Sequence, residues 1–194
     1  MAYDFDTIVN RRESDSIKWD CKENELPMWV ADMDFETCPY VKEEVERIAK
    51  LGAYGYSTLP DEYYEAISSW WLRRHKVKFE KEHIIFTTGV ISAISSIVRR
   101  LTHPGDYVLL QGPVYNTFFN SIENNGCHIL FSDLVKNNNS YEINWADLEE
   151  KMSNYKCRLM ILCNPHNPGG RSWTKEELTK LKNEVKYYFK RLAK

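Results

Sequence analysis

The spacing of apolar residues along the chain predicts helices and strands over most of its length. Apolar residues recur on one helical face at 39–52 and again at 60–75, and Pro39 suits the first turn of a helix. Residues 1–36 show neither a helical nor a strand period, although they contain the apolar cluster Leu26–Ala31. We therefore expect an extended N-terminal arm that buries its apolar residues against a neighbouring subunit.

Beyond residue 76 the apolar pattern alternates between the two periods. Strands are predicted at 83–87, 106–111, 127–131 and 159–163, and helices at 89–101, 115–124 and 145–152. The last strand is continuously apolar, which is typical of a strand buried on both faces of a parallel sheet. Asn137-Asn138-Asn139 indicates a turn, and Thr174 with Glu177 has the form of a capping box that opens a final helix. This order of elements predicts an α/β fold.

Composition and charge exclude several classes of function for this protein. The 194 residues are 43% hydrophobic and 28% charged, as in an ordinary soluble domain. A net charge of −2 provides no electrostatic reason to expect nucleic acid or an anionic membrane as a partner. The first residues resemble no secretory leader, and no apolar run approaches the roughly 20 residues that span a bilayer. A cytoplasmic protein with a small-molecule ligand is the resulting expectation.

The cysteines favour neither a disulfide framework nor a metal site. Their number is five, which is odd, their spacing is irregular, and none forms a CxxC pair. Cys157 and Cys163 flank an apolar strand, which indicates small buried hydrophobes in preference to catalytic thiols. We therefore expect reduced cysteines and no metal.

Two short loops carry candidate ligand chemistry. Gly89 lies between a predicted strand and a predicted helix, where unpaired amides and the helix dipole favour a phosphate, although a simple tight turn is the commoner reason for such a glycine. Tyr115 follows the next strand at the sheet edge where open α/β sheets bind ligands. Its ring is suited to stack on a planar cofactor, with an ordinary turn tyrosine as the equal alternative.

A third loop, Cys163–Arg171, is the most informative stretch of the sequence. Two Asn-Pro pairs and two glycines follow a predicted strand and cannot continue it, which indicates a rigid loop. Asn164 and Asn167 offer donors to a ligand oxygen or serve as turn caps, and His166 is a lone candidate for a general acid or base. Because all three loops follow strands, they should meet at one sheet edge and form a site.

Three motifs in this order resemble the cystathionine β-lyase (C–S lyase) branch of the class I/II aminotransferase-like enzymes, which depend on pyridoxal 5′-phosphate (PLP). They are Leu26–Phe35 (LPMWVADMDF), Tyr54-Gly55-Tyr56 and Asn164–Gly169 (NPHNPG), and the resemblance runs from Phe5 to about Leu181. It implies fold type I and a homodimer with active sites at the subunit interface. The implied parts are an N-terminal arm (1–38), a helical segment (39–76), part of the large PLP-binding domain, mainly parallel sheet with flanking helices (77–182), and an atypical C-terminal end (183–194).

The resemblance also assigns site residues. The backbone amides of Gly89, Val90 and Ile91 would hold the PLP phosphate. Tyr115 would stack on the pyridine ring, Asn167 would bond the ring's phenolic oxygen, and Asn164 would support the loop. The N-terminal part would supply Tyr56 to the phosphate of the partner subunit's cofactor and place three residues near the substrate, namely Trp29, Ala31 and Asp32.

The implied activity is β-elimination of cystathionine or other cysteine conjugates to pyruvate, ammonia and a thiol, with PLP as electron sink. The family places a Schiff-base lysine, a pyridinium aspartate and a carboxylate-binding arginine downstream of the NPHNP loop, and none of their motifs occurs here. Lys175, Lys180 and Lys182 belong to the final amphipathic helix and do not fit the lysine's role. We therefore assign no catalytic residue and expect a truncated chain that is not competent alone.

Two alternatives stay open beside the lyase. An aminotransferase would use the same fold and cofactor. A non-catalytic remnant would act only in binding or dimerisation, which the missing lysine motif favours. A generic nucleotide binder is disfavoured because the chain has no G-x-G-x-x-G.

Overall fold

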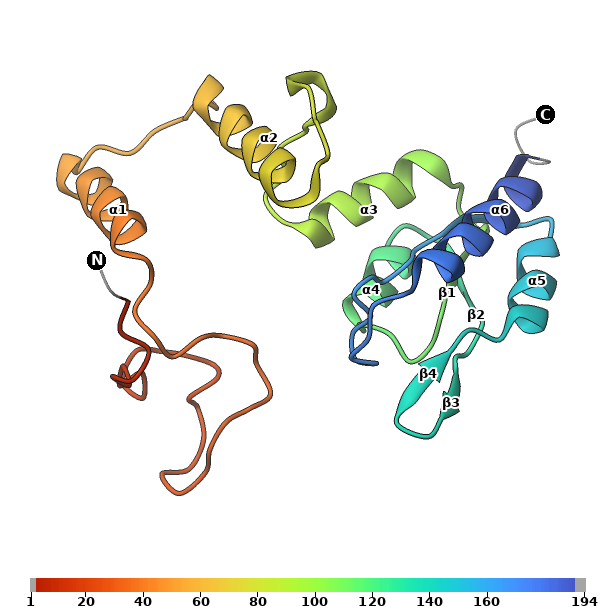
Figure 1. The fold of residues 1–194 in the computed structure, drawn as a ribbon, viewed down its shortest axis with the longest axis horizontal. Helices are drawn as coiled ribbons and strands as arrows, with labels where there is room; N and C mark the ends of the chain where they lie inside the picture. The colour runs from red at the N-terminus through yellow and green to blue at the C-terminus, as the bar shows by residue number, and fades with distance from the viewer. Residues whose placement is uncertain (1–2, 191–194) are drawn as a thin grey trace. The chain divides into compact units, whose positions relative to one another are not determined.

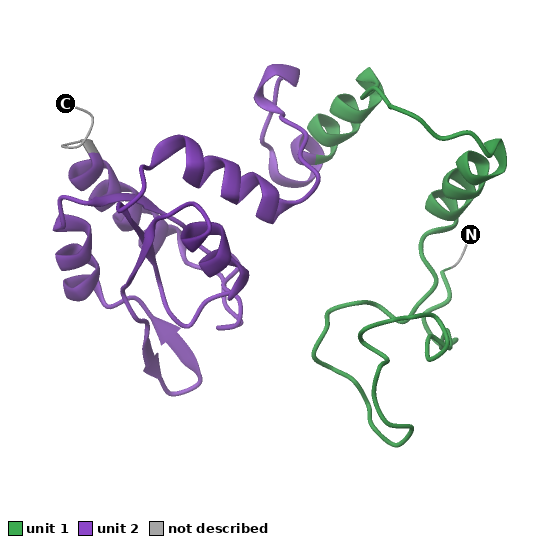
Figure 2. Ribbon diagram, turned by 180° about the vertical axis from the view of Figure 1, so that it is seen from behind, with its two compact units in different colours: residues 1–70 green, residues 71–194 purple. Residues whose placement is uncertain are grey.

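A computed structural model describes residues 3–190 and divides the chain into two compact units (Figure 2). Unit 1 extends to Trp70 and unit 2 starts at Trp71. The finer division into 1–38, 39–76, 77–182 and 183–194 stays a prediction. Of its last part, residues 191–194 lie outside the described residues.

The helices predicted in the first part of the chain are confirmed. α1 spans Pro39–Leu51 and ends at Gly52, whose φ of 63° is the left-handed conformation that glycine adopts without strain. α2 spans Asp61–His75, so it begins in unit 1 and ends in unit 2. Neither helix contains a buried residue, and the apolar face of α1, marked by Val45, is exposed. The apolar period therefore predicted the helices correctly, but it did not predict that their apolar faces would stay largely exposed.

The prediction of a strand at 83–87 is wrong. A short 3₁₀ helix, η1 (Lys81–His83), occupies its start, and residues 84–87 have no regular structure. Ile85 and Phe86 are exposed, and no described strand pairs with this segment. Strand conformation depends on hydrogen bonds to a neighbour, so an apolar run without one stays irregular.

The other predicted strands form a parallel sheet, which confirms the α/β class. β1 (Tyr107–Leu110) is the central strand: it pairs with β2 (His128–Phe131), labelled beside it in Figure 1, and on its other side with β5 (Cys157–Met160). Both neighbours run parallel to β1, with Leu109 level with Leu130 on one side and Met160 on the other. The three strands therefore have their carboxyl ends at one edge of the sheet.

β5 departs from its prediction in two respects. It begins two residues earlier and ends three residues earlier than the predicted strand at 159–163. Its side chains are also not buried on both faces, because Leu159 and Met160 are only half-buried. The physical reason is its place in the sheet: among the described strands β5 pairs with β1 alone, so it is an edge strand.

Helices cover both faces of the sheet. α3 (Val90–Leu101) and α4 (Thr117–Glu123) contribute to one apolar cluster, and α5 (Trp145–Ser153) and α6 (Lys175–Lys190) contribute to a second. Successive side chains of a strand point to opposite faces, and accordingly Val108 and Leu110 of β1 enter the first cluster while Leu109 enters the second. All three side chains are fully buried, so β1 is the centre of both cores.

The connection between β2 and α5 contains a hairpin that the sequence pattern did not reveal. β3 (Val135–Asn137) pairs antiparallel with β4 (Ser140–Glu142), and Asn138 in the turn has a φ of 49°. The turn was predicted and the strands were not. Strands of three residues are too short to show an alternation of apolar and polar positions.

α6 begins with the predicted capping box. The Glu177 amide donates to Thr174 Oγ1 at 3.2 Å, and Glu177 Oε2 accepts from the Thr174 amide at 2.7 Å. These reciprocal bonds satisfy two amides at the helix start. Within residues 3–190 no helix has both the length and the apolar character that crossing a bilayer requires.

Candidate functional site

The start of α3 presents unpaired backbone amides. Gly89 precedes the helix with φ 155° and ψ 157°, and the first helical bond runs from the Ala93 amide to Gly89 O at 3.1 Å. No side chain caps this end, so the amides of Val90 and Ile91 have no acceptor among the described residues. A Cβ built on Gly89 would meet nothing within 4 Å. Free amides, a helix dipole and open space at the glycine together suit a phosphate group.

Tyr115 lies in the loop that follows β1, at the carboxyl edge of the sheet. Its ring is 40% exposed and contacts the Phe118 ring edge-on, with 5.7 Å between the centroids. Phe118 itself is buried in the cluster beneath α4. One part of the tyrosine ring is therefore anchored and another part faces solvent, as stacking on a planar ligand requires.

The loop from Cys163 to Arg171 is held by its own hydrogen bonds. His166 N donates to Arg171 O at 2.6 Å, and Gly170 N donates to His166 O at 2.8 Å. Asn164 Oδ1 accepts from the Trp173 amide at 3.2 Å, so this side chain is engaged within the loop. The Asn167 side chain, in contrast, is exposed and makes no hydrogen bond within residues 3–190, so it is available to a ligand.

His166 connects this loop to the Tyr115 loop. Its ring is only 3% exposed, and its Nε2 lies 2.8 Å from Pro113 O. The ring also packs edge-on against Trp173 at 5.4 Å between centroids. A buried ring whose Nε2 is bonded to a backbone carbonyl is not presented to a ligand, which removes His166 from the candidates for a general acid or base.

The structure brings together all three loops within unit 2, although the loop at Gly89 does not follow a strand as predicted, because residues 84–87 are irregular. Ile91 at the start of α3 packs on the same cluster as Val114 and Phe118, which flank Tyr115 in sequence. The bond from His166 to Pro113 joins the second loop to the third. The six residues predicted to contact or support the cofactor in unit 2 thus lie on adjoining loops: Gly89, Val90, Ile91, Tyr115, Asn164 and Asn167.

The other predicted site residues lie in unit 1. Trp29, Ala31 and Asp32 occupy one exposed segment of the arm, and Asp32 Oδ2 accepts from Arg11 at 3.2 Å. Tyr56 lies between α1 and α2 and is fully exposed. These four side chains are accessible, as residues that act toward a substrate or a second subunit would be.

An ionic cluster around Asp34, which the sequence pattern did not single out, shapes this arm. Lys18 Nζ donates to Asp34 Oδ2 at 2.7 Å and to Asp32 O at 2.6 Å, and Trp19 Nε1 donates to Asp34 Oδ1 at 2.8 Å. The hydrogen bond from Lys18, and next the one from Trp19, hold the pKa of Asp34 below its usual value. The cluster ties residues 18–19 to the segment that carries Trp29 and Asp32. The only hint in the sequence was that Lys18-Trp19 and Asp34 belong to stretches that resemble the lyase family.

This cluster predicts an acid-sensitive arm. A carboxyl whose folded pKa is lowered stabilises the fold above its unfolded pKa of about 3.9, and that contribution is lost as the pH falls through the lower folded pKa. The NMR signal of the Trp19 indole N–H should therefore leave its hydrogen-bonded position only below about pH 4. Asp34→Asn should produce the acid-like signal already at neutral pH. An indole signal that stays unchanged down to about pH 2 would contradict the role of Asp34.

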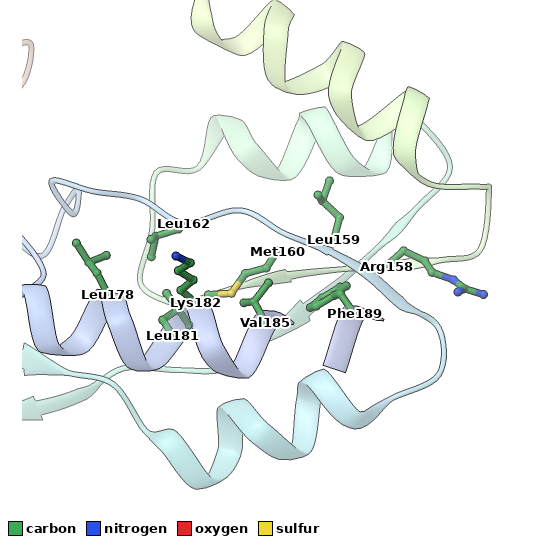
Figure 3. A pocket seen from close by; sticks show the side chains of 9 residues that line it. All are labelled: Arg158, Leu159, Met160, Leu162, Leu178, Leu181, Lys182, Val185 and Phe189. Atoms are coloured by element: carbon green, nitrogen blue, oxygen red, sulfur yellow. The ribbon is translucent and has the colours of Figure 1, made fainter. Parts of the chain in front are cut away.

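A separate apolar cavity of about 410 Å³ lies between β5 and α6 (Figure 3). Its walls are mainly Leu159 and Met160 from β5 and Leu178, Val185 and Phe189 from α6. None of the predicted cofactor residues lines it. Apart from the two cations Arg158 and Lys182 its lining is apolar, so the loops at the sheet edge are the stronger candidate for a cofactor site.

Comparison with known proteins identifies the family. Residues 24–189 match the family described as aminotransferase class I and II. The chain is 42% identical over 184 residues to cystathionine β-lyase PatB of Bacillus subtilis, an alignment that covers 91% of this chain and 47% of PatB. It is 32% identical to cystalysin of Treponema denticola, whose crystal structure contains PLP, with a TM-score of 0.90 over 97% of this chain and 50% of cystalysin.

A PLP-bound C–S lyase of Staphylococcus hominis is likewise 32% identical, with a TM-score of 0.88 over 96% of this chain and 49% of the lyase. The chain thus spans about half the length of these relatives. The match over residues 24–189 covers most of the sequence and includes all three loops of the candidate site. The chain therefore belongs to the class I and II aminotransferase family.

Proposed function

We propose that this chain forms the phosphate- and ring-binding part of a PLP site in a C–S β-lyase that acts on cystathionine or related cysteine conjugates. The observation that carries the proposal is the convergence of three adjoining loops with complementary free groups. These groups are the unpaired amides at the start of α3, the half-exposed ring of Tyr115 and the free side-chain amide of Asn167. The similarity to PatB and cystalysin supports the reaction class.

Each group has a distinct task toward the cofactor. The amides of Gly89, Val90 and Ile91 bind the phosphate, where the dipole of α3 adds to the attraction. The Tyr115 ring supports the flat face of the pyridine, and Asn167 donates to the oxygen on that ring. Asn164 keeps the loop closed by accepting from the Trp173 amide. When bound, PLP supplies the electron sink that allows a β-thiolate to leave the substrate.

The arm of unit 1 supplies the remaining proposed contacts. Trp29, Ala31 and Asp32 face the substrate, in a segment held by the Asp34 cluster. Tyr56 reaches the phosphate of the partner subunit's cofactor in a homodimer, which its full exposure permits. No residue of the chain is assigned the covalent or proton-transfer role, since the family's lysine motif does not occur in this sequence and Lys175, Lys180 and Lys182 are exposed on α6.

Binding of 4-deoxypyridoxine 5′-phosphate tests the cofactor site. This analogue of PLP lacks the aldehyde, so it cannot attach to surface lysines. We expect Asn167→Ala to weaken its binding about 10- to 100-fold, because a hydrogen bond to a charged group contributes about 1.5–3 kcal/mol. Equilibrium dialysis measures the affinity, and Asn139→Ala, an exposed asparagine in the β3–β4 turn, is the control. Equal affinities of the two variants would contradict the assigned role of Asn167.

The reaction class needs a separate test. The chain can be co-expressed with the second half of PatB, and the assembled protein incubated with cystathionine. Pyruvate that forms without any keto-acid acceptor supports a lyase. Strict dependence on an acceptor supports the aminotransferase instead.

A role in binding or dimerisation alone is the second candidate function. The exposed apolar face of α1, which includes Val41, Val45 and Ile48, favours it. Sedimentation analysis of the chain, alongside the dialysis experiment, separates the two functions. A dimer that binds no analogue supports the non-catalytic role.

A further inference from the structure

We propose that His166 is a positioning residue that holds the Tyr115 loop and the Asn167 loop at one fixed spacing. The inference rests on the proposed function, because it concerns how two cofactor-binding groups are kept in register. His166 would act by holding the backbone of the Tyr115 loop, without touching the cofactor itself.

The hydrogen bond between His166 Nε2 and Pro113 O, at 2.8 Å, carries the proposal. A carbonyl oxygen only accepts, so Nε2 must carry the proton. Pro113 precedes Tyr115 by two residues, and His166 is bonded to Asn167. This single side-chain contact therefore joins the backbones that carry the two ring-binding side chains.

The ring is held firmly enough to transmit that spacing. It is 3% exposed and packs against the Trp173 ring, while its backbone is bonded on both sides within the loop. Gly169 makes room for it, because a Cβ at that position would lie 2.7 Å from His166 Cδ2. Close packing on these sides restricts the ring, so a displacement of either loop would strain or break its bond to Pro113.

The chemistry of the imidazole ring argues against a role for His166 in packing alone. Nδ1 of His166 is buried and has no partner among the described residues. Leaving a buried nitrogen unpaired is unfavourable, and a phenylalanine would fill the same space without that cost. The imidazole is therefore suited to this place through its other nitrogen, the donor to Pro113 O.

Three variants separate positioning from packing. His166→Phe keeps a ring against Trp173 and removes the donor, His166→Gln restores a side-chain N–H, and His128→Phe alters an exposed histidine of β2 as the control. In the absence of ligand, hydrogen exchange of the amides in 114–119 should become up to about tenfold faster in His166→Phe, as expected for the loss of one hydrogen bond. His166→Gln should return the rate toward that of the wild type.

The affinity for 4-deoxypyridoxine 5′-phosphate provides the second measurement. We expect a decrease of about tenfold in His166→Phe, recovery in His166→Gln and no change in His128→Phe. Unchanged loop exchange in His166→Phe would overturn the inference, and so would faster exchange with unchanged affinity. If the wild type itself binds no analogue, the proposed function fails, and the exchange rates still decide whether His166 couples the loops.

A measurement on the wild type tests the inference even if a variant does not fold. The ¹⁵N chemical shifts of the His166 ring should identify Nε2 as protonated at neutral pH. A proton on Nδ1 with Nε2 bare would exclude the bond to Pro113 O and overturn the inference.

Discussion

Trp173→Ala is expected to lower the free energy of unfolding by about 3–5 kcal/mol. The indole is 5% exposed and belongs to the core cluster that contains Leu109 and Leu181. Its Nε1 donates to Cys163 O at 3.0 Å, and the Arg171 guanidinium lies 4.4 Å from the ring centroid. Removing the ring thus leaves a cavity, an unpaired carbonyl and an unsupported loop at the same time. Urea titration followed by circular dichroism measures the change.

Two further variants make this prediction specific. Trp29→Ala removes an equally large ring that is 68% exposed, and it should change the free energy of unfolding by no more than about 0.5 kcal/mol. Trp173→Phe keeps most of the apolar volume and loses the bond to Cys163 O, so it should fall between the wild type and Trp173→Ala. If Trp173→Ala were as mild as Trp29→Ala, the loop would not depend on the indole.

Leu109→Ala is expected to cost about 2–5 kcal/mol of unfolding free energy. Leu109 lies in the central strand β1, is fully buried and packs beneath α5 and α6 together with Leu148 and Met152. Because the side chain is fully buried in this cluster, the surrounding residues can relax only partly into the space that it leaves. The effect should appear in the urea midpoint of unit 2.

Leu101→Ala is the matched control for Leu109→Ala. Leu101 ends α3 and is 58% exposed, so the same substitution should shift the free energy of unfolding by no more than about 0.5 kcal/mol. Comparable losses in the two variants would mean that β1 is not the centre of the core.

The elements that were predicted well are those specified by neighbouring residues. The recurrence of Val98 with other apolar residues predicted α3, and the reciprocal bonds of Thr174 and Glu177 start α6 where the capping box indicated. These signals act within a few residues, through side-chain periodicity and helix-end hydrogen bonds. These local signals therefore do not depend on contacts with distant parts of the chain.

The elements that were missed or misplaced depend on partners elsewhere. Residues 84–87 have strand-like composition but no described neighbour to pair with, and β5 is half-buried because it is an edge strand among those described. The β3–β4 hairpin exists through pairing between Val135 and Glu142 rather than through any apolar pattern. Pairing and burial are properties of the assembled sheet, and composition alone does not report them.

By itself the sequence determined the α/β class, and its motifs Leu26–Phe35, Tyr54–Tyr56 and Asn164–Gly169 carried the family resemblance that pointed to the loops of Gly89, Tyr115 and Asn167. The tertiary structure decided how those loops are held. The bond from His166 to Pro113 joins two of these loops, and within the N-terminal arm the Asp34 cluster joins residues 18–19 to the segment that carries Asp32. Such contacts form only when the fold brings segments that are distant along the chain to within hydrogen-bond distance of each other. The sequence thus indicated which residues suit a PLP site, and the fold determined which others keep them in place.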